Sequence, residues 1–255
     1  MIKALDHIVI LVNDLAEAVS DYEALGFTVT PGGEHSDGAS NNALVGFADG
    51  SYLELIAFRR EVLTHRWWRH TAAGEGLIDF ALLPGSIEED VSAAKSRGLS
   101  LLGPLRGGRE RPDGVRLDWQ TAFSDPPELP FLCGDLTSRE LRVPQDAAAR
   151  HANGVTGIFR VTIAVRDMEA SAARYSALLG HAPLVEPDRR LFKLGATYIV
   201  LQAPGSDLPE RAAITARIER RGEGLAALAL RRDHLAAAPR VLDPDLSHGA
   251  RLTIS

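Results

Sequence analysis

The sequence predicts an α+β fold built from tandem β-α-β-β-β units, because one strand–helix pattern recurs along its 255 residues. Residues 6–27 have the pattern of a buried strand, a turn and an amphipathic helix that ends at a glycine. The same pattern returns 153 residues later, where Asp14 and Tyr22 are matched by Asp167 and Tyr175. A weaker copy begins 72 residues after the first. A supersecondary unit that repeats at constant offsets indicates a modular architecture.

The first unit is expected to extend from Met1 to about Phe58. Its opening strand is almost wholly apolar, as expected of a strand that is covered on both faces. Asp14 can cap the following helix, whose apolar residues recur at helical spacing. The polar, glycine-rich residues 32–41 are typical of a loop. The remaining strands are predicted at Phe27–Thr30, Ala43–Phe47 and Tyr52–Phe58, the last two joined by the hairpin signal Asp49-Gly50.

The later units follow the same plan with decreasing completeness. In the second unit we expect a helix at Ile87–Arg97, a turn-rich loop at 107–114, and strands at Leu77–Leu83, Leu99–Leu102, Val115–Phe123 and Leu129–Cys133. The third unit is predicted at Gly157–Pro204. The fourth looks truncated, with strands at Gly224–Leu230 and Arg251–Ser255 and a weak helix around Asp233–Ala238. This organisation predicts a first pair of units at residues 1–135, a linker at 136–153 and a degenerate second pair at 154–255.

Composition and charge exclude several classes of protein. Apolar residues make up 45% and charged residues 24% of the chain, which is ordinary for a globular protein. The formal net charge of −6 provides no basic footprint for nucleic acid. The apolar run near the N-terminus is too short for a signal peptide or a membrane span, so we expect no membrane partner. Cys133 is the only cysteine, which excludes an internal disulfide and predicts a cytoplasmic location.

Four stretches carry a family resemblance: LDHIVILVNDL at 5–15, GGEHSDGASNNAL at 32–44, YLELIAF at 52–58 and LPF at 129–131. In these the chain resembles the glyoxalase-like branch of the vicinal oxygen chelate superfamily, which includes glyoxalase, bleomycin-resistance proteins and extradiol dioxygenases. The resemblance covers nearly the whole chain. It implies that the βαβββ modules pair into two half-barrel domains, with the last module truncated.

The resemblance also implies a divalent metal inside the first barrel. Transferred position by position, its ligands are His7, Glu54 and Asp79, while the fourth position is apolar, at Phe131 or Leu132. One histidine and two carboxylates suit Mg²⁺, Mn²⁺ or Zn²⁺.

The residues themselves support part of this set. Glu54 lies between two leucines in a strand, and a buried carboxylate needs a charge partner or a metal. Two alternatives stay open at this point: His7 is an ordinary core histidine, or Glu54 pairs with His7 or an arginine.

The second pair lacks the candidate ligands. The positions equivalent to His7, Glu54 and Asp79 are Arg160, about Val200 and about Ala226. This argues against an extradiol dioxygenase, whose iron needs two histidines and one carboxylate, usually in the later pair. We therefore expect the second pair to be structural or an interface.

Further candidates lie near the mouth of the first barrel. The resemblance implies that His35 and Asn42 are near the cavity, although a loop histidine is often simply solvated. One of the arginines Arg109, Arg111 and Arg116, for which we choose Arg116, could bind a substrate carboxylate next to Trp119. The alternative is that these arginines are only a charged hairpin tip. His65 and His70 are five residues apart, which does not place them together on one helical face.

These observations predict a glyoxalase-like enzyme acting on a small oxygenated metabolite by metal-assisted lyase, isomerase or hydrolase chemistry. His35 and Glu54 are its candidate catalytic residues. The alternative is a binding protein of the bleomycin-resistance type, which sequesters an antibiotic or metabolite without catalysis. Either protein could form a homodimer.

Overall fold

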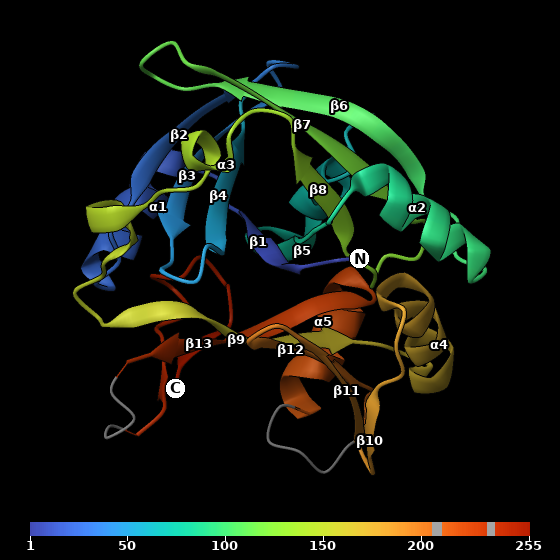
Figure 1. The fold of residues 1–255 in the computed structure, drawn as a ribbon. Coiled ribbons are helices and arrows are strands. Elements are labelled where there is room, and N and C mark those ends of the chain that lie inside the picture. Colours follow the sequence, from blue (N-terminus) through green and yellow to red (C-terminus); the bar gives the residue numbers. More distant parts are fainter. Residues whose placement is uncertain (206–210, 234–237) are drawn as a thin grey trace.

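A computed structural model describes residues 1–205, 211–233 and 238–255 of the chain, which form two β-sheets flanked by helices (Figure 1). Strands of the first half close into a barrel, and strands of the second half form an open sheet beneath it in the view of Figure 1. None of the helices in the described residues is long and apolar enough to cross a membrane.

The barrel contains the strands of the first two units. These are β1 (Ala4–Leu11), β2 (Thr30–His35), β3 (Ser40–Gly46), β4 (Tyr52–Phe58), β5 (Gly76–Leu83), β6 (Leu102–Glu110), β7 (Arg116–Phe123) and β8 (Phe131–Asp135). Their order around the barrel is β1-β4-β3-β2-β6-β7-β8-β5. The parallel β1–β4 pair and the antiparallel β1–β5 pair join the two units along their first strands.

The open sheet repeats this plan with parts missing. Its strands are β9 (Val155–Ala164), β10 (Leu184–Glu186), β11 (Arg189–Leu194), β12 (Thr197–Gln202), β13 (Gly224–Arg232), β14 (Arg240–Val241) and β15 (Leu252–Ile254). The order β10-β11-β12-β9-β13-β15-β14 matches the barrel order, except that no described strand stands where β6 would close the circle. The truncation predicted for the last unit therefore leaves the second sheet open.

Strand register confirms most of the predicted equivalences. Glu54 lies opposite Val9 in β1, and Val200 lies opposite Thr162, the residue 153 positions after Val9. Asp79 is also opposite Val9, but the residue opposite Thr162 in β13 is Ala227. The counterpart of Asp79 is thus Ala227, one residue from the expected Ala226, and the ladders to β5 and β13 carry the same irregularity at this point.

The predicted helices form on the outside of the sheets. Helix α1 (Leu15–Ala24) is capped by Asp14, whose carboxylate accepts from two backbone N–H groups. Helix α4 (Met168–Leu179) is capped by Asp167, whose carboxylate accepts from the N–H of Ala170. Helix α2 (Ile87–Ser96) begins after Ser86, whose hydroxyl accepts from the N–H of Glu89. Helices α2 and α4 pack side by side where the barrel meets the open sheet (Figure 1).

The two predicted loops are shorter than expected: only 36–39 of the first and 111–114 of the second lie outside strands. Residues 32–35 and 107–110 extend β2 and β6, which pair with each other at Glu34–Glu110 and His35–Arg109 to close the barrel, and 40–41 extend β3. Glycine makes this close approach possible: Gly33 has φ +127°, and a side chain there would collide with the carbonyl of Glu110. The glycines that indicated loops are therefore the residues that let two strands meet.

Helix α5 (Arg211–Arg221) was not predicted, and it covers the inner face of the open sheet. Ile214 and Ile218 pack against Ala164 and Ala226, on the face that corresponds to the barrel interior. The helix thus occupies the space that a second cavity would need.

The remaining short elements connect the larger ones. They are η1 (Trp68–Ala73), α3 (Arg139–Arg142) and η2 (Asp146–Ala149). The weak helix predicted around Asp233–Ala238 lies mostly outside the described residues, because 234–237 are among those omitted.

One continuous apolar core joins the barrel and the open sheet, because residues of both belong to the same buried cluster. Two buried tyrosines add hydrogen bonds between the two halves of the chain. The Tyr22 hydroxyl donates to the carbonyl of Ser247, and the Tyr175 hydroxyl donates to the carbonyl of Glu128. The open sheet therefore acts as a support packed against the barrel.

We predict that Ile214→Ala lowers the free energy of unfolding by about 2–4 kcal/mol, because it leaves a cavity where α5 packs on the open sheet. Urea unfolding followed by circular dichroism measures this loss. Glu219→Ala, on the exposed side of the same helix, should change stability by less than about 0.5 kcal/mol. Equal losses in the two variants would show that α5 is not anchored through Ile214.

Candidate active site

A cavity of about 230 Å³ lies inside the barrel. Its polar walls come mainly from β1–β4 and β6, and its apolar walls from β7, β8 and the connector before η1. Among its lining residues are His7, His35, Asn42, Tyr52, Glu54, Arg66, Trp67, Arg109, Trp119, Phe123, Phe131, Cys133 and Arg142. Five of the seven residues singled out in the sequence, His7, His35, Asn42, Glu54 and Trp119, therefore line the same cavity.

Glu54 is the centre of the polar side. Its Oε2 lies 3.5 Å from Nε2 of His7, and its Oε1 lies 3.4 Å from Nε2 of His35. The Asn42 side-chain amide donates to Oε1 at 2.5 Å. Neighbouring strands supply all four residues, since β4 lies between β1 and β3, and β2 follows β3. The rigid sheet thus holds two imidazoles and an amide around one buried carboxylate.

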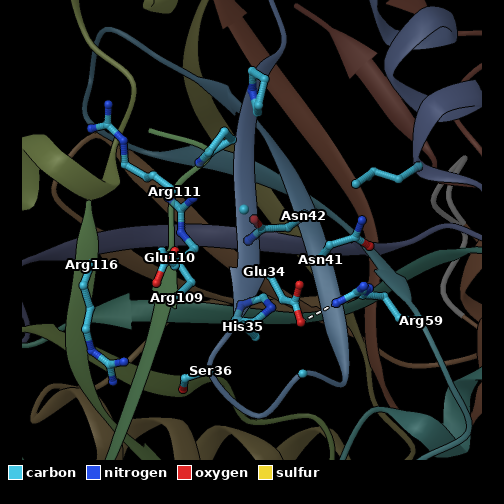
Figure 2. A pocket seen from close by; sticks show the side chains of 15 residues that line it. Glu34, His35, Ser36, Asn41, Asn42, Arg59, Arg109, Glu110, Arg111 and Arg116 are labelled. Carbon is cyan, nitrogen blue, oxygen red and sulfur yellow. Dashed lines mark ion pairs between the residues drawn. The ribbon is translucent and has the colours of Figure 1, made fainter. Parts of the chain in front are cut away.

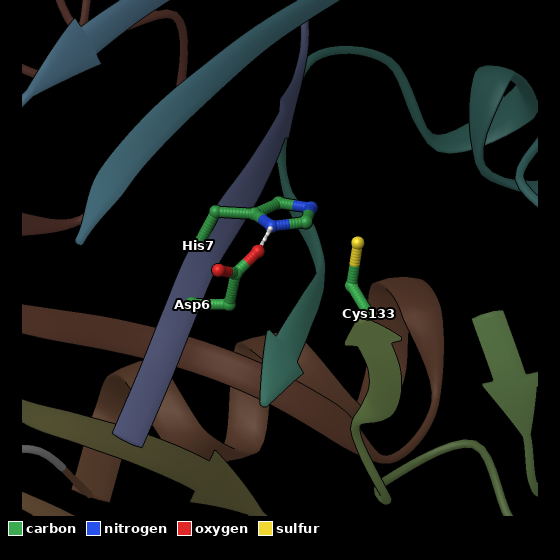
Figure 3. Close-up of side chains that lie close together, drawn as sticks. All are labelled: Asp6, His7 and Cys133. Carbon is green, nitrogen blue, oxygen red and sulfur yellow. Dashed lines mark hydrogen bonds and ion pairs between the residues drawn. The ribbon is translucent and has the colours of Figure 1, made fainter. Parts of the chain in front are cut away.

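His7 is oriented by the buried carboxylate of Asp6, which lies 2.7 Å from its Nδ1 (Figure 3). Asp6 in turn pairs with Arg142 and Arg139. Burial alone would raise the pKa of Asp6, but Arg142 and the bonded His7 outweigh this effect and hold that pKa well below its usual value. An ionised carboxylate only accepts hydrogen bonds, so His7 carries its proton on Nδ1 and presents Nε2 to Glu54.

Glu54 itself stays ionised. Burial would raise its pKa, but the hydrogen bonds and charges of His35 and His7 and the Asn42 amide outweigh burial and lower it from 4.5 to about 2. Such a carboxylate is a weak base and a good anionic ligand. The electrostatics favour a binding role for Glu54 over a proton-transfer role.

One other group of donors lies close together: atoms of Asp6, His7 and Cys133 are all within 4.8 Å of one another (Figure 3). This group is a poor metal site. Asp6 is already bound by two arginines, and burial raises the pKa of the Cys133 thiol far above its normal value. The thiolate that a metal needs is therefore disfavoured.

Asp79 lies on β5 beside this cavity but is engaged elsewhere. One carboxylate oxygen accepts from the Trp67 indole at 2.8 Å and pairs with Arg66 at 2.9 Å, and the other accepts from the backbone N–H of Phe80. The guanidinium of Arg66 also stacks over the Phe123 ring at 4.0 Å. Asp79 thus fixes the connector that covers one side of the cavity.

A second hollow of about 760 Å³ runs outside the barrel along the β2–β6 seam (Figure 2). His35, Asn42 and Arg109 line both this groove and the inner cavity. Arg116 lines only the groove; its side chain is 63% exposed and pairs with Asp118. The structure therefore brings Arg109, rather than Arg116, to the cavity.

Comparison with known proteins identifies the family of this chain. The family model described as glyoxalase-like domain matches residues 5–179, more than half of the chain. The chain belongs to the glyoxalase-like domain family, within the vicinal oxygen chelate superfamily. No curated protein matches the sequence.

Solved structures share the fold at low sequence identity. A hypothetical protein from Staphylococcus aureus is 13% identical with a TM-score of 0.78, and the match covers 100% of this chain and 99% of that one. A 4-hydroxymandelate synthase mutant from Streptomyces coelicolor is 13% identical at a TM-score of 0.61, over 92% and 73% of the two chains. A xylose isomerase-like TIM barrel/4-hydroxyphenylpyruvate dioxygenase fusion protein is 16% identical at 0.56, over 92% and 37%.

Sequence reasoning missed two parts of this glyoxalase-like site. It did not select Asp6, which orients His7, or Arg142, which holds Asp6 from a distant segment. It considered Arg109 together with Arg111 and Arg116 at a hairpin tip and chose Arg116. The signal available for Asp6 was an acid inside an apolar strand, next to the chosen histidine.

We predict that Glu54 makes stability depend on pH below its ordinary pKa. Because its pKa is lower in the folded state, its stabilisation is complete above about pH 4.5 and is lost as pH falls toward about 2. From pH 7 to pH 3 the native protein should lose about 2 kcal/mol that Glu54→Gln does not lose. Urea unfolding at both pH values measures the difference.

The matched control is Glu34→Gln, since Glu34 is a half-exposed carboxylate paired with Arg59 on the outer side of β2. Its pH dependence should follow that of the native protein. If Glu54→Gln also follows the native protein, the carboxylate of Glu54 is not stabilised by its two histidines.

Proposed function

We propose that this chain is an enzyme that binds a small oxygenated metabolite in the barrel cavity and moves a proton on it with metal assistance. The observation that carries this proposal is the convergence of His7, His35 and Asn42 on the ionised Glu54. Lyase, isomerase and hydrolase reactions can all begin with such a proton transfer.

A divalent metal fits the donors on this side of the cavity. Nε2 of His7 faces the ionised carboxylate of Glu54, and these two groups are favourable neighbours only with a proton or a cation between them. In addition, the buried Oδ1 of Asn42 has no hydrogen-bond partner among the described residues. His7 and Glu54 would hold the ion, with His35 within reach; imidazole and carboxylate together suit Zn²⁺ or Mn²⁺.

When bound, such an ion acts as a Lewis acid that polarises a substrate oxygen. The chain's own residues do the rest. Asp6 and Glu54 keep His7 oriented, and the aromatic side chains of Trp119, Phe123 and Phe131 exclude water from the substrate. His35 is the residue placed to accept or return the proton, because Ser40 lies 3.0 Å from its Nδ1 while its Nε2 faces the cavity centre.

A non-catalytic binding protein is the second candidate. It is favoured by the apolar Phe131 at the fourth ligand position, whose ring packs edge-on against His7. The two candidates differ in turnover, so a protein that binds its ligand and leaves it unchanged would be of this second kind.

We predict that protein purified without a tag or chelator contains close to one equivalent of a divalent metal, measured by inductively coupled plasma mass spectrometry. Glu54→Gln keeps the shape of the side chain and removes its charge, so it should lower metal affinity at least tenfold with the circular dichroism spectrum unchanged. His35→Gln should reduce turnover at least a hundredfold.

Asp79→Asn is the informative comparison, because Asp79 was the third ligand expected from the sequence. Its pairing with Arg66 and Trp67 predicts that this variant loses stability while keeping its metal affinity. Metal-free native protein that turns over at the full rate, or Glu54→Gln with unchanged metal content, would refute the proposed function.

A further inference from the structure

Arg109 is a buried cation whose side chain meets no carboxylate. The residue is 4% exposed, and its guanidinium donates to the backbone carbonyls of Gly32 and Arg142. Within the described residues, no acidic oxygen lies within 4.0 Å of it. Burial lowers its pKa and outweighs the more distant charges of Tyr52 and Glu54, which act to raise it.

The neighbouring arginines differ in this respect. Each has a carboxylate partner: Arg66 pairs with Asp79, Arg142 with Asp6 and Asp135, Arg111 with Asp113, and Arg116 with Asp118. Backbone carbonyls offset only part of the desolvation of a guanidinium, and a buried charge without a counter-ion is costly. A carboxylate supplied by a ligand would complete the site.

The position of Arg109 allows a ligand to reach it. It lines both the outer groove and the inner cavity, as do His35 and Asn42 (Figure 2). The inner cavity of about 230 Å³ has room for about eight water molecules at ~30 Å³ each, which is less than a drug-sized ligand needs. A molecule of that size bound to Arg109 also lies near Glu54 and the aromatic wall.

We propose that the ligand of this cavity is a small carboxylate and that Arg109 binds its carboxylate group. This inference rests on the proposed function in taking the barrel cavity as the substrate site. The planar guanidinium, held in place by its bonds to Gly32 and Arg142, can present its remaining N–H groups to the two oxygens of a carboxylate. Neutral compounds of the same shape lack the charge that this arrangement selects.

Two matched pairs of probes test the proposal: propionate against propionamide, and lactate against lactamide. Dissociation constants are measured by ligand-observed NMR on protein stripped of metal on a chelating resin. We expect each carboxylate to bind at least tenfold more tightly than its amide. In Arg109→Gln this preference should fall below about threefold.

Arg111→Gln is the control, because Arg111 lies two residues further along the chain, is paired with Asp113 and does not line the cavity. It should keep the full preference. If Arg109→Gln does not fold, Arg109→Lys keeps the charge without the planar fork and should reduce the preference at least threefold. Equal affinities within both pairs, or a preference that survives in a folded Arg109 variant, would overturn the proposal.

The outcome is independent of metal and turnover. If Glu54→Gln shows the proposed enzyme function to be wrong, the cavity can still select carboxylates through Arg109. Conversely, if the probes show no preference for the carboxylates, metal-dependent turnover can still be found.

Discussion

The site depends on one buried interaction, the contact of Asp6 with His7. Asp6 is fully buried. Arg139 and Arg142, in the segment after β8, offset its negative charge and so keep the carboxylate ionised. An ionised Asp6 fixes a proton on Nδ1 of His7 and so sets the orientation in which Nε2 faces Glu54. Because removing one partner from a buried ion pair costs about 3–5 kcal/mol, stability and the orientation of His7 are coupled in this chain.

The second constraint is the closure of the barrel at the β2–β6 seam. Only two residue pairs join these strands, and one of them, His35–Arg109, supplies two lining residues of the cavity. Glycine at position 33 allows the two backbones to approach there. The open groove outside the barrel runs along this seam and is lined in part by Gly33 (Figure 2), so the same short stretch of sheet both closes the barrel and borders the groove. The described strands of the second sheet form no such seam, and α5 covers the inner face of that sheet.

Much of the fold could be predicted from the sequence, because the repeat fixes which strands are equivalent. His7 and Glu54 were predicted to be near each other from their strand positions alone, and the registers place their strands side by side. Long-range partners could not be predicted in this way. The sequence did not show that Asp79, an expected ligand, pairs with Arg66 of the connector. It also gave no role to Asp6, because that role depends on the distant Arg142. His35 was assigned to a loop because composition cannot tell a glycine-rich strand from a turn.

The most direct test of this account is the protonation state of His7 in metal-free protein at neutral pH, read from the nitrogen shifts of its imidazole by ¹⁵N NMR. Asp6→Asn removes the charge that holds the ring and serves as the reference. The account predicts a proton on Nδ1 of His7 in the native protein and a mixture of tautomers in Asp6→Asn. A neutral ring with its proton on Nε2 in the native protein would contradict it, because His7 could not then present an electron pair to a cation at Glu54.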